Sequence, residues 1–254
     1  MKTTTMKPTR TYGLLAAALA CALPLSAQTN QWTFDVVPYL WVAGVKAETS
    51  LPDVPPSTPP GATRFDTSFG GGAMLSAQAR YRSVGLWVDF MWLGLDSKAN
   101  NPGPAFSSVD LKSDFIHSTA ALSYRLPWQG KFHADVLAGA RLWYVSEEIK
   151  ATGAALPGFN SSGDKTWVDP VIGADLRYDL SRRWSLLTKG TAGGFSSASD
   201  LGWEVMGGVS YRCSDWCSVT LGYRYLHEDY ARDRFTFNTD IQGFILGVGF
   251  HFCQ

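Results

Sequence analysis

The chain has 254 residues, 22 basic and 22 acidic side chains, and a length that suits one domain. The even charge excludes the clustered basic excess of a nucleic-acid-binding protein, so we expect no nucleic-acid partner. Aromatic residues are abundant, with 10 Trp, 10 Tyr and 14 Phe, yet no apolar run beyond the first segment reaches the ~18 residues that a transmembrane helix needs.

The first element in chain order is a predicted signal peptide over residues 1–27. Its parts are a basic start, an apolar stretch and small residues before the cleavage point: Lys2, Lys7 and Arg10, then 13–25, then Ser26 and Ala27. Lipoprotein cleavage at Cys21 is less well supported, because Ala18 stands where leucine is usual. Residues 28–254 then form the single domain, with a small acidic excess.

Alternation with a period of two runs through that domain and predicts about ten strands, although eight or twelve would need only one hairpin to be reassigned. The predicted strands are 32–46, 66–82, 85–98, 109–126, 131–149, 165–180, 184–195, 201–213, 216–230 and 235–252. Short turns alternate with longer connections at 47–65, 97–108, 150–164, 196–200 and 229–234. Short periplasmic turns and longer outer loops are typical of outer-membrane barrels, and an even strand count places both ends in the periplasm.

The two faces of each predicted strand differ in polarity. In the sixth strand, Val168 and Ile172 lie on an apolar face, whereas Asp169, Asp175 and Arg177 lie on the other. Aromatic residues at both ends of the apolar rows favour an apolar face that meets lipid. Only a closed sheet pairs every backbone amide in lipid. We therefore predict an all-β fold: a closed antiparallel up-and-down transmembrane β-barrel.

Aromatic residues recur at matching heights where the strands meet their short turns. Such a ring is expected where lipid headgroups meet the hydrocarbon. The predicted aromatic girdle comprises Tyr81, Tyr124, Tyr178, Trp184, Tyr211 and Trp216.

Several strings resemble a family of small, mostly uncharacterised bacterial outer-membrane β-barrel proteins. They are residues 32–41, 139–144, 167–174, 193–195 and 221–225. The final strand resembles the assembly signal of such barrels, although Cys253 and Gln254 follow Phe252 where the family normally stops. The resemblance implies an integral outer-membrane location, lipid contact and recognition of the last strand by the barrel-assembly machinery. It implies no activity, and we expect no cofactor.

Charged residues of the non-apolar face would fill the lumen. This predicted lumen network comprises Arg80, Asp89, Arg141, Asp169, Asp175, Arg177, Lys189, Glu204 and Arg224. Hairpin registers predict diagonal pairs of Arg80 with Asp89 and of Glu204 with Arg224, and place Asp175 between Arg141 and Lys189. Buried charges need partners, so we interpret the set as salt bridges that fill a narrow barrel. The alternative is a lumen that passes or binds a small polar solute.

The histidines offer a second chemistry. His117 could face Asp89 across two strands and act as the base of an outer-membrane hydrolase, but spacing fixes no serine beside the pair. A lumen histidine bonded to a neighbour is the better-supported interpretation, also for His133 and His251. His227, near Glu228 and Asp229, is too sparse a set to predict a metal site.

Three cysteines remain after signal removal, Cys213, Cys217 and Cys253, all at the predicted periplasmic rim in an oxidising compartment. Their odd number leaves one thiol without a partner in the chain. Cys213–Cys217 has the shorter separation, and Cys217–Cys253 stays open as an alternative.

The function expected from these features is a non-enzymatic outer-membrane barrel, either an envelope structural protein or a narrow small-solute pathway. The alternatives are a hydrolase that acts at the outer rim and a surface-binding protein that uses loops 47–65, 97–108 and 150–164. The oligomeric state and the solute stay open.

Overall fold

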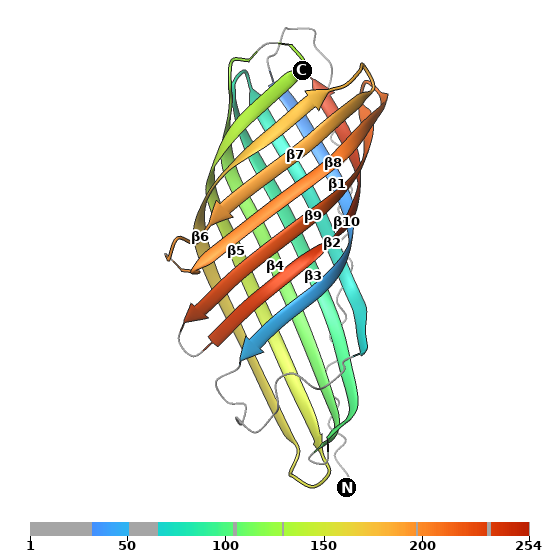
Figure 1. The fold of residues 1–254 in the computed structure, drawn as a ribbon, viewed down its shortest axis with the longest axis vertical. Coiled ribbons are helices and arrows are strands. Elements are labelled where there is room, and N and C mark those ends of the chain that lie inside the picture. The colour runs from blue at the N-terminus through green and yellow to red at the C-terminus, as the bar shows by residue number, and fades with distance from the viewer. Residues whose placement is uncertain are drawn as a thin grey trace, which may run out of the picture.

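Ten antiparallel strands close into one barrel in a computed structural model that describes residues 32–50, 66–103, 106–128, 130–196, 198–232 and 235–253 (Figure 1). The strands are β1 (Trp32–Ser50), β2 (Asp66–Tyr81), β3 (Val84–Gly103), β4 (Phe106–Arg125), β5 (Phe132–Gly153), β6 (Phe159–Asp179), β7 (Trp184–Gly193), β8 (Leu201–Ser214), β9 (Cys217–Arg232) and β10 (Phe235–Cys253). The predicted signal peptide and most of loop 47–65 lie outside the described residues. The predicted fold class and all ten strands are confirmed.

The barrel closes because β1 pairs with both its sequence neighbour and the last strand. The β1–β10 ladder runs from Thr33 opposite Cys253 to Ser50 opposite Thr236. The β1–β2 ladder is much shorter and ends where Pro38 lies opposite Leu75. Proline has no backbone N–H to donate to a ladder. The first strand is therefore fastened mainly to the end of the chain.

The longer connections differ from the prediction. Much of the predicted loops 97–108 and 150–164 is strand, so that only 104–105 separate β3 from β4 and only 154–158 separate β5 from β6. Cross-strand pairing continues through these polar segments and includes an ion pair between Lys98 and Asp110 at 3.6 Å. As a result, β3 to β6 extend well past the ends of β7 to β10 (Figure 1).

The outer surface of the wall is apolar, as the alternation predicts. Val42 and Ile172 are 77% and 59% exposed, and Leu40, Leu122 and Phe244 are exposed in the same way. Such a continuous apolar band is unfavourable in water and is the surface that a bilayer covers. Among the described residues, no helix is long and apolar enough to cross a membrane.

All six predicted girdle residues lie at one end of the barrel, which we call the short-turn end: the end where β2–β3, β4–β5, β6–β7 and β8–β9 are joined. Trp184 lies opposite Tyr211 with ring centroids 4.8 Å apart. Trp216 stacks on Phe250 at 6.2 Å and is 59% exposed. Their role at a membrane interface stays a prediction.

A charge placed on the apolar band tests its contact with lipid. We expect Ile172→Arg to lower the free energy of unfolding from lipid vesicles by about 2–4 kcal/mol, the cost of arginine on a barrel's lipid face. Leu156→Arg is the matched control, because Leu156 is exposed in the β5–β6 connection. Urea titration of tryptophan fluorescence measures both. Equal stability of the two variants would show that Ile172 does not face lipid.

Candidate functional site: the filled lumen

Two layers of side chains fill the lumen. A charged layer comprises Asp89, His117, Arg141, Glu204 and Arg224 and lies nearer the short-turn end. An aromatic layer lies beside it, away from that end. Its members are Trp41, Phe115, Trp143, Trp167, Tyr230 and Phe237.

Arg224 is the centre of the charged layer. Its Nη2 atom lies 3.0 Å from Oδ2 of Asp89 and 2.9 Å from Oε2 of Glu204. Its Nη1 atom donates to the Tyr39 hydroxyl at 2.6 Å, and that hydroxyl lies 3.1 Å from both Asp89 carboxylate oxygens. The guanidinium also covers the Trp41 ring at 4.8 Å. Strands β1, β3, β8 and β9 therefore meet at one buried cation.

Arg141 on β5 connects the charged layer to strands β4, β7 and β8. Its Nε atom donates to Thr119 at 3.4 Å, its Nη2 atom donates to Thr191, and Nη2 lies 3.8 Å from Oε2 of Glu204. His117 lies 4.0 Å from the same carboxylate oxygen. Arg141 and Arg224 thus share Glu204, and two threonine hydroxyls accept hydrogen bonds from the Arg141 guanidinium.

The aromatic layer packs ring against ring. The Trp143 and Trp167 rings stack with centroids 5.9 Å apart, and Trp167 stacks on Tyr230 at 4.2 Å. Phe237 lies edge-on to both tryptophans, with centroids 5.8 Å apart. Trp143 and Phe237 are 0% exposed, so no solvent reaches them from either end. Trp143 is two residues from Arg141, and Trp167 is two residues from Asp169, so each tryptophan lies on the same face of its strand as a charged lumen residue. This spacing is the signal in the sequence that points to a layer of large side chains in the lumen.

The β7–β8 connection folds onto this layer. Asp169 accepts hydrogen bonds from the Ser199 backbone N–H at 2.9 Å and the Ser199 hydroxyl at 2.7 Å. Trp167 donates through Nε1 to Glu228 at 3.1 Å. Among the described residues Asp169 therefore anchors this loop rather than pairing with a cation, and sequence reasoning did not place Ser199 or Glu228 in the lumen.

The predicted ion pairs are partly correct. The Glu204–Arg224 pair is confirmed at 2.9 Å, and Lys189 lies 3.0 Å from Asp175. Arg141 does not reach Asp175, because the β5–β6 register places it opposite Asp169.

The predicted Arg80–Asp89 pair is wrong. Arg80 binds Asp135 on β5, which also binds Arg125 at 2.6 Å. Asp89 is held instead by Arg224, across the closed barrel.

His117 does not face Asp89. It lies opposite Met91, while Asp89 lies opposite Thr119. The imidazole is 0% exposed and packs edge-on to Trp143 at 4.7 Å. Neither of its ring nitrogens has a hydrogen-bond partner among the described residues. His117 is therefore beyond the reach of any substrate at the outer rim.

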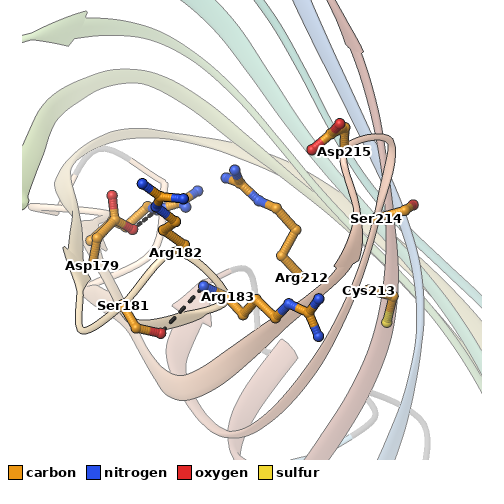
Figure 2. Close-up of a pocket in the computed structure, with 9 residues that line it drawn as sticks. Asp179, Ser181, Arg182, Arg183, Arg212, Cys213, Ser214 and Asp215 are labelled. Carbon is orange, nitrogen blue, oxygen red and sulfur yellow. Dashed lines mark hydrogen bonds and ion pairs between the residues drawn. The ribbon is translucent and has the colours of Figure 1, made fainter.

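A positively charged cavity lies at the short-turn end, with a volume of about 410 Å³ (Figure 2). Its lining is Arg177, Asp179, Ser181, Arg182, Arg183, Arg212, Cys213, Ser214 and Asp215. Arg177 binds Asp179 at 2.8 Å. Figure 2 shows the guanidinium groups of Arg182 and Arg212 directed into the same space. Arg177, predicted as part of the lumen network, belongs to this rim instead.

The cysteines do not form the preferred staple. Cys213 and Cys217 are both free thiols, and Cys213 lies in a bulge where the β8–β9 register shifts. Cys217 lies opposite Phe250, three residues from Cys253 along β10. A disulfide requires Cα atoms less than about 7 Å apart, so this register does not favour a Cys217–Cys253 bridge either.

The described residues hold no group of three or more metal-ligating side chains. His227 binds Asp240 at 2.9 Å, whereas Glu228 next to it is fully buried beside Trp167. Adjacent strand residues point to opposite faces, which separates His227 from Glu228.

Several solved protein structures resemble this chain. The outer-membrane protease OmpT from Escherichia coli is 10% identical, with a TM-score of 0.54 over 90% of this chain and 99% of that one. OprG from Pseudomonas aeruginosa is 9% identical, with a TM-score of 0.36 over 89% and 98%. Neisserial surface protein A is 19% identical, with a TM-score of 0.35 over 87% and 96%. The likeness to OmpT concerns the fold alone, and no curated protein matches the chain.

The family of this protein follows from a match that covers nearly the whole sequence. The outer membrane protein beta-barrel domain matches residues 13–252. With an apolar outer wall and a closed ten-stranded sheet, the chain belongs to this family and is an integral β-barrel protein of the bacterial outer membrane.

Proposed function

We propose that this protein is a sealed outer-membrane barrel, an envelope structural protein rather than a solute pathway. The observation that carries the proposal is the complete burial of the layers that cross the lumen. Trp143, Phe237 and His117 are 0% exposed, and Arg141 is 1% exposed. A barrel of about ten strands is narrow enough for side chains alone to fill it.

The chemistry of the charged layer also favours a seal. A conducting lumen needs charges that water can reach, whereas Arg224 and Glu204 are almost completely buried and bind each other. Breaking such a network to admit a solute would leave buried ions without partners, which is strongly unfavourable. The charged layer therefore fastens opposite walls together.

The last strand supports insertion by the barrel-assembly machinery. The outward side chains of β10 include Phe244, Leu246 and Phe252, which are 64%, 49% and 51% exposed. An apolar terminal strand that ends close to an aromatic residue suits recognition at an open sheet edge. We therefore propose that the barrel-assembly machinery binds β10.

Planar-bilayer recording tests the seal. We expect the refolded chain to stay silent and Trp143→Ala combined with Phe237→Ala to give discrete steps, because both rings cross the lumen. The matched control is Phe244→Ala, which removes an equal ring from the lipid face and opens nothing. Discrete steps in the unmodified protein that change with Asp175→Asn would show that the lumen is a water path.

The buried cation has a measurable stabilising role. We expect Arg224→Ala to lower the free energy of unfolding by about 3–5 kcal/mol, because Asp89 and Glu204 lose their buried partner. Lys98→Ala breaks the exposed pair with Asp110 and should cost less than about 1 kcal/mol. Urea unfolding in lipid vesicles measures both. Similar small losses in the two variants would contradict a central role for Arg224.

A further inference from the structure

Three side chains at the short-turn end lie together although they are far apart in sequence: Asp35 on β1, Ser218 on β9 and His251 on β10. His251 lies directly opposite Asp35 in the β1–β10 ladder. Ser218 lies opposite Gly249 in the β9–β10 ladder. Gly249 is two residues from His251, so both lie on the same face of β10. Closure of the barrel thus places the imidazole between a carboxylate and a hydroxyl.

The distances between these three side chains are short enough for a proton to pass from the serine to the histidine. The Ser218 hydroxyl lies 2.8 Å from Nε2 of His251, and Nδ1 of His251 lies 2.6 Å from Oδ1 of Asp35. A carboxylate that accepts from Nδ1–H leaves Nε2 free to accept the serine proton. Of the four histidines, all of which are described, only His251 has a hydroxyl at one ring nitrogen and a carboxylate at the other.

A small molecule can reach this group from the short-turn end. The side chains of His251 and Asp35 are 26% and 37% exposed, and Ser218 is 6% exposed at the bottom of the group. Gly249 permits the close approach of the hydroxyl to His251, since a Cβ atom there would lie 2.6 Å from the serine oxygen.

The neighbouring strand adds positive charge. Arg212 lies opposite Ser218 in the β8–β9 ladder and lines the cavity of Figure 2. Directly opposed residues on paired strands have Cβ atoms about 4.5–5.5 Å apart. Neither Arg212 nor Arg182 has an ion-pair partner among the described residues, whereas Arg177 is held by Asp179. A substrate at Ser218 would therefore have an unneutralised guanidinium beside it.

We propose that Ser218 and His251 are catalytic residues, positioned by Asp35, that hydrolyse carboxylic esters bearing a carboxylate or phosphate group. This departs from the expectation that His251 is a lumen histidine that only bonds to a neighbour, and it does not depend on the seal. The Ser218 oxygen bonds to the ester carbonyl carbon as its proton passes to Nε2 of His251. The ester C–O bond breaks, and the alcohol leaves with that proton.

Water then completes the cycle. Its oxygen attacks the acyl carbon while Nε2 takes its proton, and the bond to Ser218 breaks. The proton returns to the serine oxygen as the acid departs, so His251 and Ser218 regain their starting states. Arg212 stabilises negative charge on the bound substrate.

A fluorophosphonate probe tests the nucleophile directly, because it forms a covalent bond only with an activated serine. We expect mass spectrometry of the refolded full chain to locate the label on Ser218. Ser218→Ala should abolish labelling, and His251→Gln should slow it about 100-fold or more. Ser210→Ala is the matched control, because Ser210 bonds to Thr220 rather than to a histidine. An unlabelled Ser218 in a chain with the heat-sensitive gel mobility of a folded barrel would overturn the proposal.

The positioning role of Asp35 has its own readout. Asp35→Asn should slow labelling about 100-fold or more, because the imidazole loses its acceptor at Nδ1, while Asp35→Glu should recover part of the rate. Equal labelling rates in the Asn variant and the unmodified protein would remove Asp35 from the relay.

Substrate charge is tested with matched esters. If the site binds a carboxylate, 4-nitrophenyl hydrogen succinate should be hydrolysed faster than neutral 4-nitrophenyl butyrate. If it binds a phosphate, lysophosphatidylglycerol micelles should release fatty acid, so the two assays together distinguish carboxylate from phosphate recognition. Arg212→Gln should lower the ratio of the succinate rate to the butyrate rate at least about tenfold. Equal rates for charged and neutral esters would overturn the anionic preference.

Discussion

The rest of the structure depends on one constraint: in lipid, every backbone N–H and C=O of the wall needs a partner within the protein. A sheet satisfies this only when its first and last strands meet, as β1 and β10 do from Thr33 to Ser50. Closure fixes which side chains face outward, and the outer band that includes Val42 and Ile172 follows from it. It also creates an interior that lipid cannot fill.

Two kinds of residue point into that interior, aromatic and charged, and each kind fills it in a different way. Flat rings such as Trp143 and Trp167 exclude water by stacking, and Arg224 binds carboxylates from strands on different sides. The two solutions support each other: the dry aromatic layer lowers the local dielectric around the charges, and the ion pairs hold the walls that the rings contact. The arginines of the rim cavity and the Asp35–His251–Ser218 group lie outside these two layers, at the short-turn end.

Alternation and turn residues sufficed to predict the strands, the outer face and local pairs such as Glu204–Arg224, because hairpin neighbours are set by nearby sequence. Contacts across the lumen were not predictable in this way. Asp89 meets Arg224 only after the barrel has closed, and the separation between them depends on strand tilt and stagger, which alternation does not encode. The same holds for the contact between Asp35 and His251, since β1 and β10 become neighbours only on closure, whereas Ser218 and His251 lie on one hairpin.

The two ladders of β1 differ in length, and this difference has a consequence for biogenesis. Most of this strand has its ladder with β10 and only Trp32–Pro38 pairs with β2, so the strand made first waits for the strand made last. Until translation ends, an apolar strand such as this lacks its main pairing edge. Open edges of this kind join other chains readily. A product cut short before β10 therefore loses both ends of the wall at once.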